Sequence, residues 1–157
     1  MRKVFAEMLH AEMAKNPQLY LITGDLGYGI LDRIRDDYPD RFLNVGSCEQ
    51  LMIGTAVGLS YSGYIPIGYS ITPFLLYRPF EMIRNYVDHE NLNIKLVGSG
   101  RDKDYDHDGF THHAEDDLLV LKSLKNIRLM KPAHLTSDVF GTFLSSQSPT
   151  YLNLKRF

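Results

Sequence analysis

Apolar positions along the chain recur with two different periods, which predict strands and helices in alternation. Short apolar runs predict six strands, at residues 19–23, 42–45, 64–70, 93–98, 127–130 and 150–154. Apolar spacings of three and four predict helices around them, at 2–15, 30–38, 79–87 and 115–123, with one more beginning near 49 and another running through 139–143 and ending near 147. This alternation predicts a single α/β domain over residues 1–157, with a mainly parallel sheet covered on both faces in a three-layer αβα arrangement.

The stretch 42–63 combines a strand, a glycine turn and a helix. The strand is closed by Gly46, and the helix begins near Glu49, with four apolar residues expected on roughly one face: Leu51, Met52, Ala56 and Leu59. Gly54 and Gly58 predict room for another backbone to lie close to this helix. Glu49 is therefore expected where a strand ends and a helix starts, the usual position of a site in an open α/β sheet.

The position of Glu49 has two interpretations. An acidic residue in the first turn stabilises the positive end of a helix, here with Ser47 as the N-cap. Alternatively, the neighbours Cys48, Leu51 and Met52 predict a partly buried carboxyl group, which could share a proton with a ring nitrogen. Position alone favours the first interpretation, because acidic residues are common in the first turn of helices.

Composition excludes several classes of function. The formal net charge is −2 and no basic block occurs, so nothing suggests binding to nucleic acid or to an anionic membrane. The first residues do not form a signal peptide, and no apolar run is long enough to span a bilayer. A single cysteine excludes an intrachain disulfide framework and fits a reducing compartment. We therefore expect a soluble cytoplasmic domain.

Two polar stretches could carry chemistry. The glycines of 24–29 lack the GxGxxG order and no lysine follows them, so they predict a flexible turn rather than a phosphate cradle. The stretch 100–117 has three interpretations: a solvated loop, a metal site or a substrate-recognition loop. Its histidines (His107, His112 and His113) lack the i, i+4 spacing of a helical metal site, and no HExxH pattern occurs.

Three segments together resemble the pyrimidine-binding domain of transketolases and the related deoxyxylulose-phosphate synthases. They are Gly46-Ser-Cys-Glu-Gln-Leu-Met with the following Ala56-Val-Gly-Leu-Ser, the loop that carries Phe74, and Asp108-Gly-Phe-Thr-His. The resemblance covers nearly the whole chain, to about Leu154. It implies a thiamine-diphosphate-binding fold in which Glu49 hydrogen-bonds N1′ of the cofactor's aminopyrimidine and acts in catalysis.

The same resemblance implies roles for further residues. Phe74 and Tyr77, expected on a loop before a helix with Pro79 in its first turn, would stack on the aminopyrimidine. Asp25 and Leu26 would contribute to the cofactor pocket and to a subunit contact. The implied substrate-binding residues are Asp108, His112, His113 and Arg78, with His112 also catalytic. No residue of this chain is expected to ligate a metal.

The chain departs from the family pattern at three positions. Ile71 stands where a further aromatic residue is expected, so one wall of the pocket differs. Phe110 replaces a proline, which changes the rigidity of its loop. His113 replaces a glutamine that usually follows the histidine, and this could change the choice of acceptor.

The sequence also lacks the Gly-Asp-Gly motif, followed by Asn, that holds Mg²⁺ and the diphosphate in this superfamily. The resemblance therefore implies a split enzyme. By this resemblance we expect that a separate subunit supplies the diphosphate-binding half and Mg²⁺, that the third transketolase domain is absent, and that the assembly is an α2β2 heterotetramer. The expected reaction is ketol transfer between sugars or sugar phosphates, with no donor or acceptor identified.

Three alternatives stay open from the sequence. One is the β-subunit of a 2-oxo acid dehydrogenase or synthase that uses thiamine diphosphate. Another is a metal-dependent hydrolase built on residues 107–117. The third is a noncatalytic module that keeps the fold.

Overall fold

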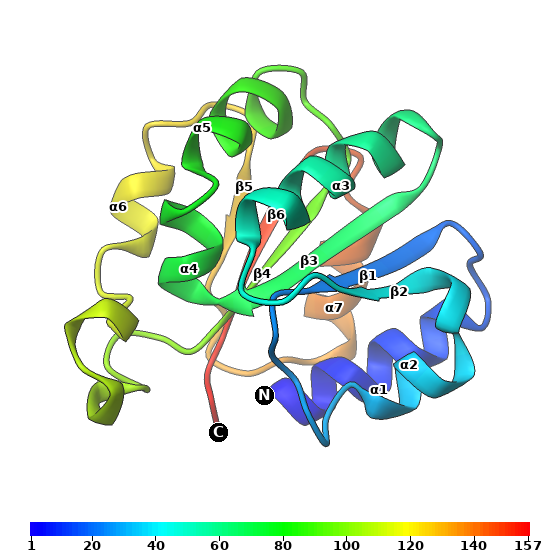
Figure 1. The fold of residues 1–157 in the computed structure, drawn as a ribbon, viewed down its shortest axis with the longest axis horizontal. Helices are drawn as coiled ribbons and strands as arrows, with labels where there is room; N and C mark the ends of the chain where they lie inside the picture. The colour runs from blue at the N-terminus through cyan, green and yellow to red at the C-terminus, as the bar shows by residue number, and fades with distance from the viewer.

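The computed structural model describes all 157 residues, and its six strands form one parallel sheet (Figure 1). The strand order is β2-β1-β3-β4-β6-β5, and every neighbouring pair is parallel. The strands are β1 (Leu19–Thr23), β2 (Phe42–Asn44), β3 (Ile65–Ile71), β4 (Lys95–Ser99), β5 (Arg128–Met130) and β6 (Thr150–Leu154). The predicted parallel sheet is thus confirmed.

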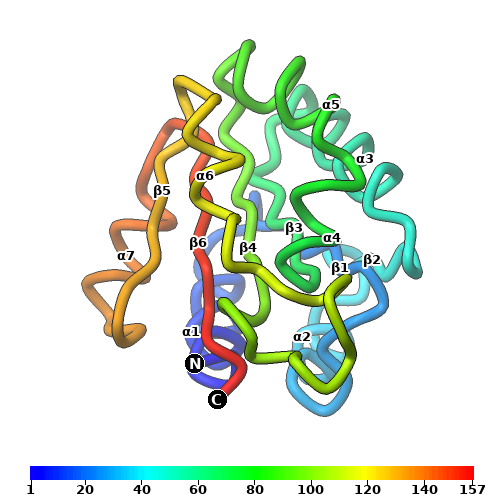
Figure 2. Tube along the Cα trace, turned by 90° about the vertical axis from the view of Figure 1, so that its left-hand side faces the viewer, coloured from blue at the N-terminus to red at the C-terminus, as the bar shows by residue number.

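Helices cover both faces of the sheet, so the fold has three layers (Figures 1 and 2). One face is covered by α1 (Arg2–Met13), α2 (Asp32–Asp37) and α7 (Ser137–Ser145). The other is covered by α3 (Glu49–Tyr61), α4 (Thr72–Tyr77), α5 (Phe80–Met82) with its π-helical continuation Ile83–Asp88, and α6 (Asp117–Leu121). Short 3₁₀ turns lie at Pro39–Arg41, Asp106–Asp108 and Phe110–His112.

The apolar strands feed two separate cores because successive side chains point to opposite faces. In β1, Leu21 packs with α1, α2 and α7, whereas Ile22 packs with α3 and α4. Phe5 lies at the centre of the first core, with its ring stacked on Tyr69 and edge-on to Phe140, each at 5.9 Å between centroids. Burial on both faces explains why the strands read as continuous apolar runs.

Two local predictions about α3 are wrong, and a third, the buried face, is right for Met52 and Ala56 but wrong for Leu51. The N-cap is Cys48, not Ser47, so no side chain caps the helix. The buried face consists of Met52, Ile53, Ala56 and Val57, while Leu51 is 57% exposed. No backbone lies against the glycines: a Cβ at Gly54 would meet the Met82 side chain at 3.1 Å, and one at Gly58 would meet nothing within 4 Å.

The segment that carries Phe74 and Tyr77 is also not a loop. It forms α4, which starts directly after β3 with Pro73 in its first turn. Proline is favoured there because its missing N–H would be unpaired in any case. Pro79, predicted in the first turn of the next helix, is the N-cap residue of α5.

The carboxyl ends of all six strands lie at one edge of the sheet, where β1 connects outward to β2 on one side and lies beside β3 on the other. Immediately after β1, the amide of Gly24 donates a hydrogen bond to the carbonyl of Tyr69 in β3, at 3.1 Å. This is the topological switch point at which open α/β sheets bind ligands. No helix in the structure has the length and apolar character needed to cross a bilayer.

Candidate active site

The carboxylate of Glu49 lies at this switch point. Glu49 is the first residue of α3, and only 1% of its surface is exposed. The hydroxyl of Ser70, near the end of β3, donates a 2.8 Å hydrogen bond to Glu49 Oε1. Gly24 lies so close that a Cβ there would be 3.0 Å from the same oxygen. The predicted burial of Glu49 is therefore real, and more complete than the sequence indicated.

The second carboxylate oxygen is paired with Arg78. Arg78 Nη1 donates to Glu49 Oε2 at 2.6 Å, and its guanidinium carbon lies 3.9 Å from the centroid of the Phe74 ring. Charge-assisted hydrogen bonds of this kind are among the strong ones, and an arginine over an aromatic face adds a cation–π attraction. The carboxylate, the guanidinium and the Phe74 ring thus form one contiguous unit.

Phe74 also contacts the polar loop. The rings of Phe74 and His112 meet edge to face, with 4.8 Å between centroids and an interplanar angle of 69°. The hydroxyl of Thr111 lies 3.1 Å from Nδ1 of His112. The structure therefore brings together Glu49, Arg78, Phe74 and His112, which come from three distant segments of the chain.

Tyr77 points to a different neighbour. It lies at the end of α4, and its hydroxyl donates a hydrogen bond to Asp116 in the polar loop. Burial, followed by this bond to a carboxylate, raises the pKa of Tyr77 above its usual range. In the structure, Tyr77 thus ties α4 to the polar loop.

Asp25 and Leu26 follow Gly24 after the end of β1. Asp25 is exposed and adopts a left-handed conformation, with φ of 55°. Its amide donates to Asn44 Oδ1 at 3.1 Å, and its carboxylate accepts a hydrogen bond from the Tyr28 hydroxyl. The side chain of Leu26 packs against the core beneath α1.

The remaining predicted substrate residues lie on the polar loop, Asp108 exposed and His113 mostly buried. Asp108 is exposed and faces His107, with 3.2 Å between Oδ2 and Nε2. His113 turns to Asp106, with 3.0 Å between Nε2 and Oδ1. The three histidines therefore point to different neighbours, and no group of three or more His, Cys, Asp or Glu side chains is placed to hold a metal ion.

Sequence reasoning missed a buried polar network beneath this loop. Thr72 Oγ1 donates to the carbonyl of Gly100 at 2.7 Å and accepts from Asn153 Nδ2 at 3.1 Å. Tyr151 donates to Asp117 at 2.8 Å, and burial together with that carboxylate raises the pKa of Tyr151 well above its usual value. The available signal was an asparagine inside the apolar final strand.

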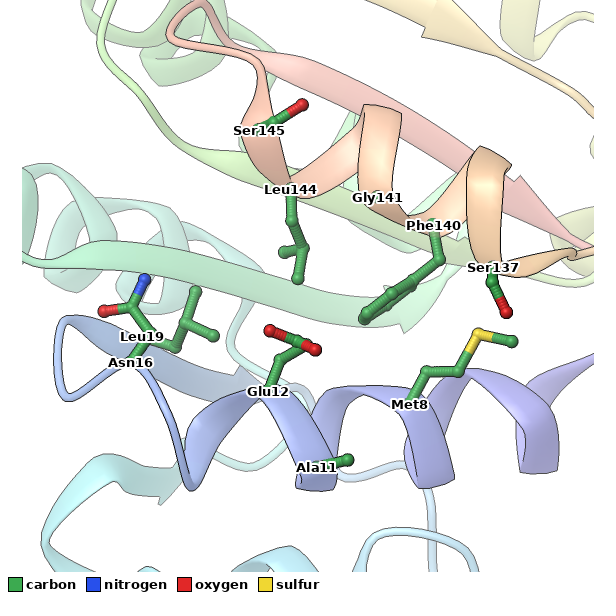
Figure 3. Close-up of a pocket in the computed structure, with 10 residues that line it drawn as sticks. All are labelled: Met8, Ala11, Glu12, Asn16, Leu19, Ser137, Phe140, Gly141, Leu144 and Ser145. Atoms are coloured by element: carbon green, nitrogen blue, oxygen red, sulfur yellow. The ribbon is translucent and has the colours of Figure 1, made fainter.

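A groove of about 450 Å³ lies elsewhere, between α1 and α7 (Figure 3). Figure 3 shows Met8 and Glu12 on α1 facing Phe140 and Leu144 on α7. The groove holds a single ionisable side chain, so it lacks the convergent polar groups of a catalytic site.

The sequence is similar to a known family and to several curated proteins. Residues 1–156 match the family described as "Transketolase, pyrimidine binding domain". The chain is 31% identical over 159 aligned positions to a protein of Methanocaldococcus jannaschii named as a putative transketolase C-terminal section, and the alignment covers 99% of this chain and 50% of that protein. It is 35% identical over 120 positions to one subunit of the apulose-4-phosphate transketolase of Actinobacillus succinogenes, with 75% of this chain and 39% of that protein covered.

The fold is similar to that of a solved transketolase. A structure described as "Split gene transketolase, inactive beta4 tetramer" superposes with a TM-score of 0.85 at 28% identity. The superposition covers 99% of this chain and 51% of that one. The chain thus spans about half the length, or less, of these relatives.

Proposed function

The chain belongs to the transketolase pyrimidine-binding-domain family, and from this premise we propose that it is the pyrimidine-binding subunit of a split transketolase that uses thiamine diphosphate. In this proposal the enzyme transfers a two-carbon ketol unit between sugars or sugar phosphates. The observation that carries the proposal is the buried carboxylate of Glu49 at the switch point, beside the ring of Phe74.

The residues present fit an aminopyrimidine. Arg78 is a planar hydrogen-bond donor, and it lies over the Phe74 ring while donating to Glu49. A flat aromatic ring with a hydrogen-bond donor at its edge can make the same two contacts, a hydrogen bond to Glu49 and stacking on Phe74. Glu49 would bind N1′ and hold a proton there, and Phe74 would orient the ring by stacking. When bound, thiamine diphosphate supplies the nucleophilic carbon that carries the ketol unit.

The polar loop is proposed to bind the sugar. His112 contacts Phe74, so a group bound between them would lie next to the cofactor position. Asp108 and His113 extend from the same loop and can accept or donate hydrogen bonds to hydroxyl groups. Asp25, Leu26 and Tyr77 complete the proposed rim of the cofactor pocket, at the ends of β1 and α4.

A separate subunit is proposed to hold the diphosphate and Mg²⁺, in an α2β2 assembly. Two observations support it. The sequence contains no Gly-Asp-Gly motif followed by Asn, and the relatives include a protein named as a transketolase subunit. The structurally similar split transketolase is described as inactive in its β4 form, which supports the expectation that this chain is inactive alone.

The decisive experiment is reconstitution. The chain is mixed with a subunit that carries the diphosphate-binding motif, and calorimetry follows binding of thiamine diphosphate with Mg²⁺. We expect binding and ketol transfer only with both chains present, and weaker binding in Phe74→Ala. Ketol transfer by the lone chain would refute the split-site proposal. Absence of cofactor binding by the pair would refute the proposed function.

A further inference from the structure

The carboxylate of Glu49 cannot be reached by any ligand in the structure as it stands. Its side chain is 1% exposed, and each oxygen is covered by a different group. Ser70 donates to Oε1, and Gly24 lies against the same oxygen. Arg78 donates to Oε2 at 2.6 Å. A molecule that hydrogen-bonds Glu49 can therefore bind only after one of these three groups moves.

Two of the three groups are fixed by the sheet. Ser70 is fully buried within β3, a strand with neighbours on both sides. Gly24 is held to β3 by the backbone hydrogen bond to Tyr69. Moving Gly24 would break its backbone hydrogen bond to β3, and the Ser70 side chain is completely buried, so its hydroxyl has no solvent to turn into.

Arg78 is the group free to move. Its side chain is 42% exposed, and its only hydrogen bond in the structure is the one to Glu49. Apart from the bond to Glu49, the contact that holds the guanidinium is its stacking over the Phe74 ring. Withdrawal requires only rotation about its own single bonds, into solvent that already contacts it.

We propose that Arg78 is an internal occupant of the pyrimidine position, which closes the site in the free chain and withdraws when the cofactor binds. The inference rests on the proposed function, because that function places an aminopyrimidine on Glu49 and Phe74. The guanidinium makes both of those contacts itself: it donates to Glu49 and lies over the Phe74 ring. Arg78 and the aminopyrimidine therefore compete for the same two groups.

The closed arrangement also stabilises the free chain. A buried carboxylate without a partner is strongly unfavourable, and Arg78 provides its charge partner. The proposal predicts that only a small fraction of free chains is open, that is, has Arg78 withdrawn from Glu49. The apparent affinity for an aminopyrimidine is then the affinity of the open chain multiplied by that fraction.

The test uses the purified chain and the neutral probe 4-amino-2,5-dimethylpyrimidine, which carries no diphosphate and so needs no partner chain. Nuclear magnetic resonance follows the signals of Glu49, Ser70 and Phe74 during titration. We expect Arg78→Gln to bind the probe about tenfold more tightly than the natural chain, because the open fraction is no longer limiting. Arg78→Lys keeps the charge but not the planar group, so its affinity for the probe is expected to lie between those of the natural chain and Arg78→Gln.

Arg84→Gln is the matched control, because Arg84 is exposed on the neighbouring π-helical stretch and hydrogen-bonds Asn85. It should bind the probe like the natural chain. Equal binding by the natural chain and Arg78→Gln, weaker binding by Arg78→Gln, or no binding by either would overturn the proposal. Ketol-transfer activity is not part of this readout, so failure of the proposed function is seen separately, in the reconstituted pair.

Discussion

The ring of Phe74 meets the imidazole of His112 edge to face, 4.8 Å between centroids. Phe74 lies on α4, directly after a central strand, whereas His112 ends a 3₁₀ turn in the polar loop. The contact places the aromatic surface proposed for the cofactor beside the side chain proposed for the sugar. Tyr77 and Asp116 join the same two segments by a second bond, so the two halves of the site are held together at two points.

Replacing Glu49 by Gln should remove catalysis with a smaller effect on binding. The amide keeps the size of the side chain but cannot hold the proton that a carboxylate shares with a ring nitrogen. We expect kcat of the reconstituted enzyme to fall about 10² to 10⁴-fold, the usual contribution of a positioned acid–base group. Calorimetry should show cofactor affinity within about tenfold of the natural pair.

Glu81→Gln is the control for this change, since Glu81 is exposed on α5 and should leave kcat unaltered. A Glu49→Gln enzyme that keeps more than about a tenth of its kcat would show that Glu49 is only a buried partner of Arg78.

Replacing His112 by Ala should separate sugar binding from cofactor binding. The imidazole is expected to contact the donor sugar, so kcat/KM for the ketose should fall about 100-fold. Cofactor affinity should change by only a small factor, because Phe74 keeps its place in α4. The measurement is steady-state kinetics of the reconstituted pair, with the donor varied at saturating cofactor.

His89→Ala serves as the comparison, because His89 is exposed beyond the π-helical stretch. If His112→Ala lowers cofactor affinity and leaves the ketose KM unchanged, the histidine supports the Phe74 ring and does not contact the sugar.

Much of the architecture follows from sequence because the strands are buried on both faces and read as apolar runs. The predicted strands 19–23 and 150–154 match β1 and β6 in the structure. The position of Glu49 also follows from the strand–turn–helix pattern. The pairing of Glu49 with Arg78 does not, because 29 residues separate them and only the folded path of α4 brings them together.

Very short helices were the second kind of feature that the sequence did not predict. The segments Thr72–Tyr77 and Phe110–His112 span two turns at most, too few for an apolar period to appear. The role of Asn153 was hidden for a different reason: its partners are a loop carbonyl and side chains, which no local pattern records.

Two glycines should respond in opposite ways to substitution by alanine. At Gly98 in β4, an added Cβ would lie 2.6 Å from Thr72 Oγ1 and 2.9 Å from the Tyr151 hydroxyl, so the buried network must shift. We expect Gly98→Ala to lower the free energy of unfolding by about 1–3 kcal/mol, the usual cost of overpacking. Urea denaturation followed by circular dichroism measures the change.

Gly141→Ala is the matched counterpart within α7, where an added Cβ meets nothing within 4 Å. It should raise the free energy of unfolding by about 0.5–1 kcal/mol, because alanine loses less conformational freedom in a helix. Equal effects of the two substitutions would contradict the contacts described for Gly98.

Lys95 should make stability depend on pH in the alkaline range. Its side chain is fully buried at the start of β4, and Nζ donates to the carbonyls of Ser146 at 2.7 Å and Ser148 at 3.4 Å. Burial, with a smaller effect of Arg128, lowers the pKa of Lys95 from 10.5 to about 8. Between these values the unfolded chain binds more protons than the folded chain, so this contribution to stability rises with pH.

The measurement that isolates this contribution compares the natural chain with Lys95→Met, because other titrating groups, the tyrosines included, are common to both. The free energy of unfolding of the natural chain should gain about 2 kcal/mol relative to Lys95→Met between pH 8 and pH 10. Well below pH 8 the two curves should run parallel, since the amine is then protonated in both the folded and the unfolded chain. Lys122→Met, at an exposed position after α6, should show no such divergence. Parallel curves for Lys95→Met across the whole range would mean that the two carbonyls and local water solvate the ammonium group as well as bulk solvent does.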